Sequence, residues 1–178
     1  MAMINVMRRL IILSTIFFIS VTTSAEYALV ADYVIDGKSD DPLKNKVILV
    51  SGKKIVSIID IDAIPEKYTV INLPETTLMP GMVNAHEHPL LYQSDYQNGH
   101  LQASSAFKAL IGLKTLQRLL ASGWTSIRVM GDGDIYYANQ DIRKAIDRDM
   151  FLGPRLTGAA HYISITGGGG DINYLSPE

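Results

Sequence analysis

The 178-residue sequence contains no cysteine, and charged residues make up only 19% of it. The missing cysteines exclude a disulfide framework, a thiolate metal site and a cysteine nucleophile. The formal net charge is −2, and no run of basic residues follows Arg9. Because nucleic-acid backbones require clustered positive charge, we expect no nucleic-acid partner. Any metal ion must then be held by histidine, carboxylate or modified lysine.

The first 25 residues have the pattern of an export signal. Residues 1–9 carry two arginines, residues 10–21 are an apolar stretch, and Thr23-Ser24-Ala25 offers small residues for cleavage. A membrane-spanning helix needs about 20 apolar residues, so this stretch is too short for a stable span. We therefore expect residues 1–25 to be a signal peptide and the protein to be exported, periplasmic or extracellular. An uncleaved anchor or a core helix is the alternative.

Residues 26–77 are expected to form a small antiparallel sheet. Their β-branched and aromatic residues gather in short runs separated by turn residues, which is typical of strands. The segment Ser51-Gly52-Lys53 connects two Val/Ile-rich runs in the manner of a hairpin. Four strands are predicted, at residues 27–36, 46–52, 53–62 and 68–73.

Residues 78–178 follow a different pattern, in which strands and helices alternate. The predicted elements are a strand at 82–88, a helix from Ser104 or Ser105 to Gly123, a strand at 124–130, a helix from Asn139 or Asp141 to Gly153-Pro154, and a strand at 155–166. Strand, helix, strand, helix, strand predicts a parallel sheet with right-handed crossovers.

His86 and His88 are separated by one residue in an extended run. Side chains at positions i and i+2 of a strand share a face, so the two imidazoles are predicted to form a clamp for a divalent ion. Glu87 points the other way and is not counted as a ligand. The spacing does not fit the helical H-E-x-x-H zinc clamp, and a pair of ordinary surface or core histidines is the alternative.

The remaining polar features give weaker signals. Asp132-Gly133-Asp134 lacks the further oxygen ligands of a calcium loop. Gly167–Gly170 lacks the Lys-Ser/Thr of a phosphate-binding loop, so we expect no nucleotide site. His161 and Tyr162 are expected on opposite faces of the last strand, and His100 is interpreted as a solvated side chain in a polar loop.

The segment LMPGMVNAHEHP, which follows a VINLP-type strand, resembles the amidohydrolase superfamily. The stretches GWTSIRVMGDGD, LGPRLTGA and ISITGGGGD are similar to the branch that contains imidazolonepropionase-like proteins and Xaa-Pro dipeptidases. The resemblance extends from Tyr27 to Asp171. It implies an α/β fold with a β-sandwich segment at residues 26–77 and the first strands and helices of a (β/α)8 barrel at residues 78–178. These are about 100 residues against about 250 in a whole barrel, so the resemblance implies an incomplete barrel.

The resemblance also implies a function, namely metal-dependent hydrolysis of carbon–nitrogen bonds in small substrates such as Xaa-Pro dipeptides or cyclic amides. One or two divalent ions, usually zinc, would be bound, with His86 and His88 as the first two ligands. The carboxylated lysine, two histidines and aspartate of later barrel strands have no counterpart here, so no catalytic residue is expected in this chain. His161 and Asp171 are the candidates for substrate contacts, although Gly169 replaces a histidine that is common in relatives. Homo-oligomers are frequent in the family.

We therefore expect the chain to be the N-terminal part of an exported hydrolase that is inactive alone. A non-catalytic remnant of a decayed hydrolase gene is one alternative. An exported β-rich binding module is another, but such a module has no reason to contain the βαβαβ order.

Overall fold

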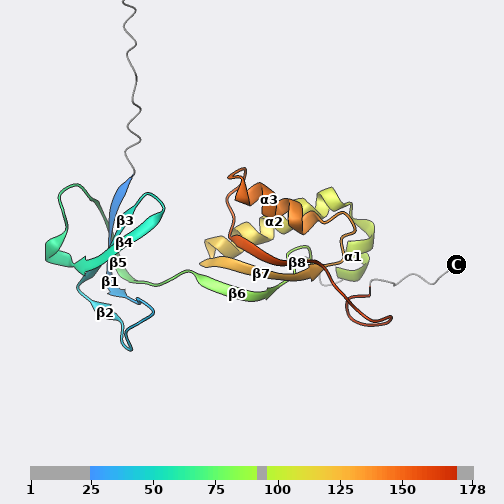
Figure 1. The fold of residues 1–178 in the computed structure, drawn as a ribbon, viewed down its shortest axis with the longest axis horizontal. Helices are drawn as coiled ribbons and strands as arrows, with labels where there is room; N and C mark the ends of the chain where they lie inside the picture. The colour runs from blue at the N-terminus through green and yellow to red at the C-terminus, as the bar shows by residue number, and fades with distance from the viewer. Residues whose placement is uncertain (1–24, 92–95, 172–178) are drawn as a thin grey trace, which may run out of the picture. The chain divides into compact units, whose positions relative to one another are not determined.

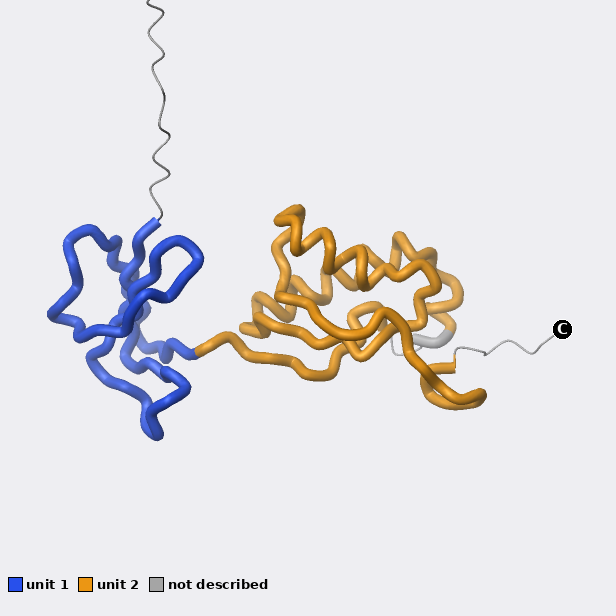
Figure 2. The backbone as a smooth tube through the Cα atoms, in the orientation of Figure 1, with its two compact units in different colours: residues 1–79 blue, residues 80–178 orange. Residues whose placement is uncertain are grey.

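The computed structural model describes residues 25–91 and 96–171, which belong to two compact units, residues 1–79 and 80–178 (Figure 2). The predicted signal peptide lies outside the described residues except for Ala25. None of the described helices is long and apolar enough to span a bilayer.

The first unit is a five-stranded sheet built around β1 (Figure 1). The four predicted strands are present, and a short fifth strand precedes the second of them. Their bounds are β1 (Glu26–Val34), β2 (Leu43–Lys44), β3 (Lys46–Ser51), β4 (Lys54–Asp60) and β5 (Thr69–Leu78). β1 pairs antiparallel with β2 and β3, and β3 pairs antiparallel with β4, so the hairpin at Gly52-Lys53 is confirmed.

The sheet is mixed, and the prediction of a purely antiparallel sheet was wrong. β5 pairs with β1 in parallel, from Tyr27 opposite Thr69 to Val34 opposite Leu78. Hairpins place β4 in the same direction as β1, and the segment between β4 and β5, which contains a 3-10 turn at Ile61–Ala63, then carries the chain to the free side of β1. A connection of this kind between parallel strands gives no short turn signal in the sequence.

Unit 1 has a small core on one side of its sheet. Ala28, Val47 and Leu49 are buried, and Val30, Ile59, Ile64 and Tyr68 pack against them. Val47 and Leu49 are two residues apart in β3 and therefore point to the same face. By contrast, Ile55 and Val56 of β4 are 68% and 51% exposed, so this strand contributes little to the core.

The second unit confirms the predicted alternation of strands and helices. Its strands β6 (Met82–Glu87), β7 (Trp124–Asp132) and β8 (Arg155–His161) form a parallel sheet in that order. Helices α2 (Ser105–Ala121) and α3 (Ala138–Asp147) connect them and lie on one face of the sheet (Figure 1). The Ser104 hydroxyl accepts a hydrogen bond from the Phe107 N–H at 3.2 Å, as expected for the residue that caps α2.

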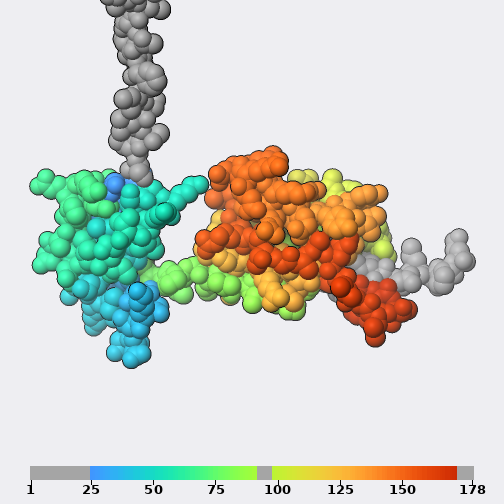
Figure 3. All heavy atoms as spheres, in the orientation of Figure 1, coloured from blue at the N-terminus to red at the C-terminus, as the bar shows by residue number. Residues whose placement is uncertain are grey.

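Three features of unit 2 differ from prediction. A short helix, α1 (Tyr96–Gln102), precedes α2. α3 ends well before Gly153, because Asp149 adopts a left-handed φ of +55° and the N–H groups of Asp149 and Met150 donate to the carbonyls of Ile146 and Ala145, which is a Schellman ending. β8 ends at His161 and not at residue 166, because its partner β7 ends at Asp132, the residue opposite His161. The residues after His161 form a loop that projects from the unit (red in Figure 3).

The core of unit 2 lies between the sheet and the two long helices. Its buried side chains come from β7, β8, both helices and the segment after β6, and they are Leu90, Leu116, Ile127, Ala138, Ile142 and Leu156. All the strands run in the same direction, so their carboxyl ends lie along one edge of the sheet. At that edge an α/β sheet places its functional residues.

Candidate metal centre

The two predicted ligands lie together at the carboxyl end of β6. His86 is the next-to-last residue of the strand and is exposed, and His88 follows the strand and is half-buried. Their Nε2 atoms are 3.2 Å apart, and the rings are nearly perpendicular with centroids 5.1 Å apart. The structure therefore brings the pair together, with both imidazoles converging through the same ring nitrogen.

This geometry fits a shared metal ion. Two nitrogens that bind one tetrahedral zinc ion at 2.0–2.1 Å lie about 3.3 Å from each other. A direct hydrogen bond between the two nitrogens has a similar length. In that arrangement one Nε2 carries a proton and the other uses its lone pair to accept it, so neither lone pair is free for a metal ion. No third His, Asp or Glu joins the two histidines to complete a cluster within residues 25–91 and 96–171.

The orientation of His88 is set by the backbone of the neighbouring strand. Its Nδ1 lies 2.7 Å from the carbonyl oxygen of Gly131. A carbonyl only accepts, so Nδ1 carries the proton and Nε2 of a neutral ring keeps its lone pair. This is the arrangement in which metal-binding histidines are normally held.

Gly131 is required where β7 approaches β8. Its φ of +110° is unfavourable for other residues, and a Cβ would lie 2.7 Å from the carbonyl carbon and oxygen of His161. The close approach of the two strand ends therefore depends on glycine at this position. It also places the Gly131 carbonyl within reach of His88.

Glu87 is occupied elsewhere, as expected. Its carboxylate accepts hydrogen bonds from the Asn84 side-chain amide at 2.7 Å and from the His88 N–H at 3.2 Å. The Asn84 carbonyl oxygen in turn accepts from the His86 N–H at 3.0 Å. This small network fixes the backbone of the strand end that carries the histidine pair.

Asp132, the last residue of β7, is a buried carboxylate that sequence reasoning considered only as part of a calcium loop. It is 0% exposed, and its Oδ2 accepts from the Asn139 amide at 2.8 Å. Oδ1 has no hydrogen-bond partner among the described residues, although the Leu90 backbone amide interacts more weakly with the carboxylate. Burial raises the pKa of Asp132 to about 6, against opposing contributions from Asn139 and His88. Its position at the end of a parallel strand was the signal available in the sequence.

Asp132→Asn is expected to stabilise the metal-free protein at neutral pH. Between about pH 4 and about pH 6 the folded state binds a proton at Asp132 that the unfolded state does not, so wild-type stability falls as pH rises through this window. The shift from 3.8 to about 6 corresponds to about 3 kcal/mol. The asparagine retains an acceptor for Asn139 but does not titrate. Urea unfolding at several pH values from 4 to 7.5 measures the unfolding free energy of the wild type and the variant. A difference between the two proteins that stays constant with pH would contradict the expectation.

His161, a candidate for substrate contact, lies at the end of β8 beside Asp132. Its Nε2 is 2.6 Å from the Asp134 carbonyl oxygen, and its ring stacks on Tyr137 with centroids 4.4 Å apart. Tyr137 has a φ of +61°, an unusual backbone conformation for a bulky residue. A cavity of about 290 Å³ adjoins these groups and is lined by Asp132, Gly133, Ile135, His161, Tyr162 and Gly170. The Tyr162 ring centroid lies 5.4 Å from that of His88, which connects this cavity to the histidine pair.

Asp171, the second candidate for substrate contact, has a local role in the structure. Its carboxylate accepts a hydrogen bond from the Gly167 N–H at 2.7 Å, and its own N–H donates to the Gly168 carbonyl at 2.9 Å. These bonds close the glycine-rich loop on itself.

His100 is not a solvated side chain, as predicted, but is only 4% exposed. It belongs to α1, which packs its ring close to two buried charged residues, Lys108 and Asp134. Burial lowers the pKa of His100, and the positive charge of Lys108 lowers it further. Its polar sequence neighbours gave no sign of this packing.

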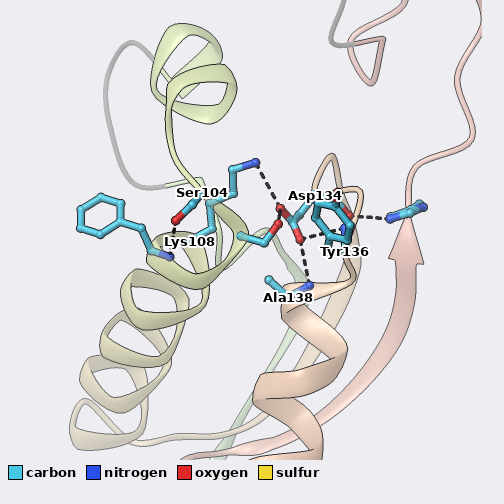
Figure 4. Close-up of polar contacts among 8 residues, drawn as sticks. Ser104, Lys108, Asp134, Tyr136 and Ala138 are labelled. Carbon is cyan, nitrogen blue, oxygen red and sulfur yellow. Dashed lines mark hydrogen bonds and ion pairs between the residues drawn. The ribbon is translucent and has the colours of Figure 1, made fainter.

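Sequence reasoning also missed the buried ion pair between Lys108 and Asp134, whose closest atoms are 3.1 Å apart (Figure 4). The Asp134 carboxylate further accepts from the Ser105 hydroxyl at 2.7 Å and from the N–H groups of Tyr136 and Ala138 at 3.3 and 3.0 Å. It thereby joins the first turn of α2 to the first turn of α3. These donors hold the pKa of Asp134 below its usual value, despite the opposing effect of burial.

Comparison with known proteins gives relatives of similar sequence and fold. Ochratoxinase from Aspergillus niger is 27% identical over 175 residues, which are 95% of this chain and 34% of that protein. A crystal structure of a Xaa-Pro dipeptidase with bound methionine superposes with a TM-score of 0.71 at 26% identity, over 85% of this chain and 37% of the other. The crystal structure of A. niger ochratoxinase gives 0.68 at 26% identity, over 86% and 35% of the two chains.

The chain thus spans about a third of the length of the relatives it matches. The Amidohydrolase family matches residues 77–176, a range that includes the histidine pair, Asp132 and all three parallel strands. This chain belongs to the amidohydrolase family.

Proposed function

We propose that this chain contributes to a metal-dependent hydrolase that cleaves carbon–nitrogen bonds, amide or peptide, in small substrates. His86 and His88 are two of its metal ligands. The observation that supports this most directly is the 3.2 Å separation of the two Nε2 atoms, together with the Gly131 carbonyl that holds the His88 Nδ1 proton. Both features prepare nitrogen lone pairs for a cation.

The residues of the chain prepare the site in three ways. The Gly131 carbonyl fixes the ring and tautomer of His88, and Asn84 fixes the backbone of His86. The cavity beside Tyr162 offers space for a substrate next to the pair. A bound divalent ion, which we propose to be zinc, supplies polarisation of the substrate carbonyl and activation of water. Catalytic zinc needs three protein ligands, so we propose that hydrolysis requires ligands beyond the described residues.

Xaa-Pro dipeptides and cyclic amides are the proposed substrates. Likeness to a Xaa-Pro dipeptidase structure supports the choice of dipeptides. The cavity of about 290 Å³ matches a small molecule, and His161 on its wall is the proposed substrate contact. Asp171 remains the second candidate, although its carboxylate is bound to its own loop.

The same proposal covers the architecture and the location of the protein. Residues 26–77 form the β-sandwich segment, and residues 78–178 form the first strands and helices of a (β/α)8 barrel. Residues 1–25 direct export and are removed, and copies of the protein associate into homo-oligomers. The parallel β6–β7–β8 order supports the barrel assignment.

The proposal is tested by measuring metal dependence and hydrolysis together. The 178-residue chain, and any longer product that its gene encodes, are treated with a chelator and then titrated with zinc. We expect zinc to raise the Tm of both proteins, because a ligand that binds the folded state stabilises it. Release of proline from Xaa-Pro dipeptides is expected from the longer product alone, and only with metal. Hydrolysis that is indifferent to the chelator would contradict the proposal.

A further inference from the structure

Asp132 is a buried carboxylate that its surroundings leave only partly satisfied. The residue is fully buried, and one oxygen accepts from Asn139 while Oδ1 lacks a hydrogen-bond partner among the described residues. A buried charge without a counter-charge is costly to a folded protein. A positive group near this carboxylate would remove that cost.

No basic side chain within the described part of the chain forms an ion pair with Asp132. Lys108, the buried lysine of α2, is paired with Asp134 instead. Asp132 and Asp134 are two residues apart but have different surroundings. Asp134 receives a lysine, a hydroxyl and two backbone N–H groups, whereas Asp132 receives one side-chain amide and a weaker interaction with the Leu90 backbone amide. The negative charge of Asp134 is therefore balanced by its surroundings, whereas that of Asp132 is not.

The histidine pair lies nearby and is the site at which a bound cation would bring positive charge. Asp132 directly follows Gly131, whose carbonyl oxygen accepts a hydrogen bond from His88 Nδ1 at 2.7 Å. Positive charge placed at His88 would attract the Asp132 carboxylate. A divalent cation on Nε2 of His88 would extend this interaction, because attraction between opposite charges is strong where water is excluded.

We infer that Asp132 is a positioning residue whose negative charge strengthens cation binding at His86 and His88 without ligating the cation. The inference rests on the proposed function, since it requires the pair to bind metal. Asp132 is not counted as a ligand, because the described residues contain no cluster in which a third His, Asp or Glu joins the pair. Asp132 acts through the field at the pair and through the strand end that orients His88.

Asn139 supports this role by holding the carboxylate in place. Its amide donates to Asp132 Oδ2 and, at 2.9 Å, to the carbonyl of Ala160 in β8. Asp132 is thereby fixed between α3 and β8, and cannot swing away from the pair toward solvent.

The test compares zinc affinity with the stability of the metal-free protein. Isothermal titration of the full chain at pH 7.5 is carried out on the wild type, Asp132→Asn, His88→Ala and Asp141→Asn. Asp141 is an exposed aspartate on α3 and loses the same charge as a matched control. We expect Asp132→Asn to bind zinc about 10- to 100-fold more weakly. Its metal-free Tm should nevertheless rise, and Asp141→Asn should match the wild type in affinity.

A purely structural role for Asp132 would lower affinity and stability together, so opposite changes in the two measurements support the inference. Unchanged affinity in Asp132→Asn, with binding lost in His88→Ala, overturns the inference but leaves the metal pair intact. Absence of zinc binding in the wild type overturns both the metal pair and the inference. Asp132→Ser, which keeps one oxygen acceptor, replaces the asparagine variant if that variant does not fold.

Discussion

Replacing His88 with alanine is expected to abolish zinc-dependent stabilisation of the chain. One imidazole remains after the change, and a single nitrogen does not hold a divalent ion against water. Removing a residue that hydrogen-bonds to a metal ligand typically weakens metal affinity 10- to 100-fold. Removing a ligand itself should weaken it more, so we expect zinc affinity to fall by at least about 100-fold. Titration calorimetry gives the affinity, and thermal unfolding with and without zinc gives the stabilisation.

His86→Ala should have the same effect on zinc and a different effect on the metal-free fold. His86 is exposed, whereas the His88 ring donates a hydrogen bond to Gly131 and lies against Tyr162. Only His88→Ala should therefore reduce metal-free stability, by about 1 kcal/mol for the lost hydrogen bond. His161→Ala is the control of the same residue type and should bind zinc like the wild type. Equal zinc binding by all three variants would refute the metal pair.

Asp134→Ala is expected to cost about 4 kcal/mol of unfolding free energy, because breaking a buried ion pair from one side leaves the other charge unpaired. Lys108 is that charge, and its side chain is 8% exposed. The change also removes the acceptor for the Ala138 N–H at the first residue of α3. Total stabilities of 5–15 kcal/mol are usual, so unit 2 would lose a large part of its margin. Urea unfolding followed by circular dichroism measures the loss.

Asp141→Ala provides the matched control, since Asp141 is an exposed aspartate of α3 whose salt bridge to Lys144 should contribute less than about 1 kcal/mol. A Lys108→Met variant and the double variant with Asp134→Ala complete a thermodynamic cycle. The double variant should be more stable than Asp134→Ala alone, because no unpaired charge is then buried. A cost for Asp134→Ala as small as that of the control would contradict the role assigned to the ion pair.

The elements of unit 2 were predictable because each has a local signal. Ser104 caps α2, apolar residues recur along that helix, and β-branched residues mark the β7 strand. The i, i+2 spacing of His86 and His88 likewise indicated that the two side chains lie close together, although the orientation of the His88 ring depends on the distant Gly131 carbonyl. Local rules were sufficient wherever the contact partners are close in the sequence.

Features that depend on distant residues were missed. Lys108 and Asp134 are 26 residues apart, and neither neighbourhood signals a buried charge. His100 is buried by packing of a short helix, and β5 joins β1 in parallel through a crossover. Asp132 has the same difficulty, because its burial depends on Asn139 and on the end of β8.

The parallel order of β6, β7 and β8 separates the apolar residues of the unit 2 core from the polar residues of the proposed site. Leu116, Ile127 and Leu156 lie between the sheet and the helices, whereas His86, Asp132 and His161 lie at the strand ends. Changes in the loops that follow the strands can therefore reshape this edge while the apolar interior stays the same. Asp134 is the exception at this edge, because its ion pair with Lys108 also holds α2 and α3 together, so a change there alters the site and the stability of the unit at once.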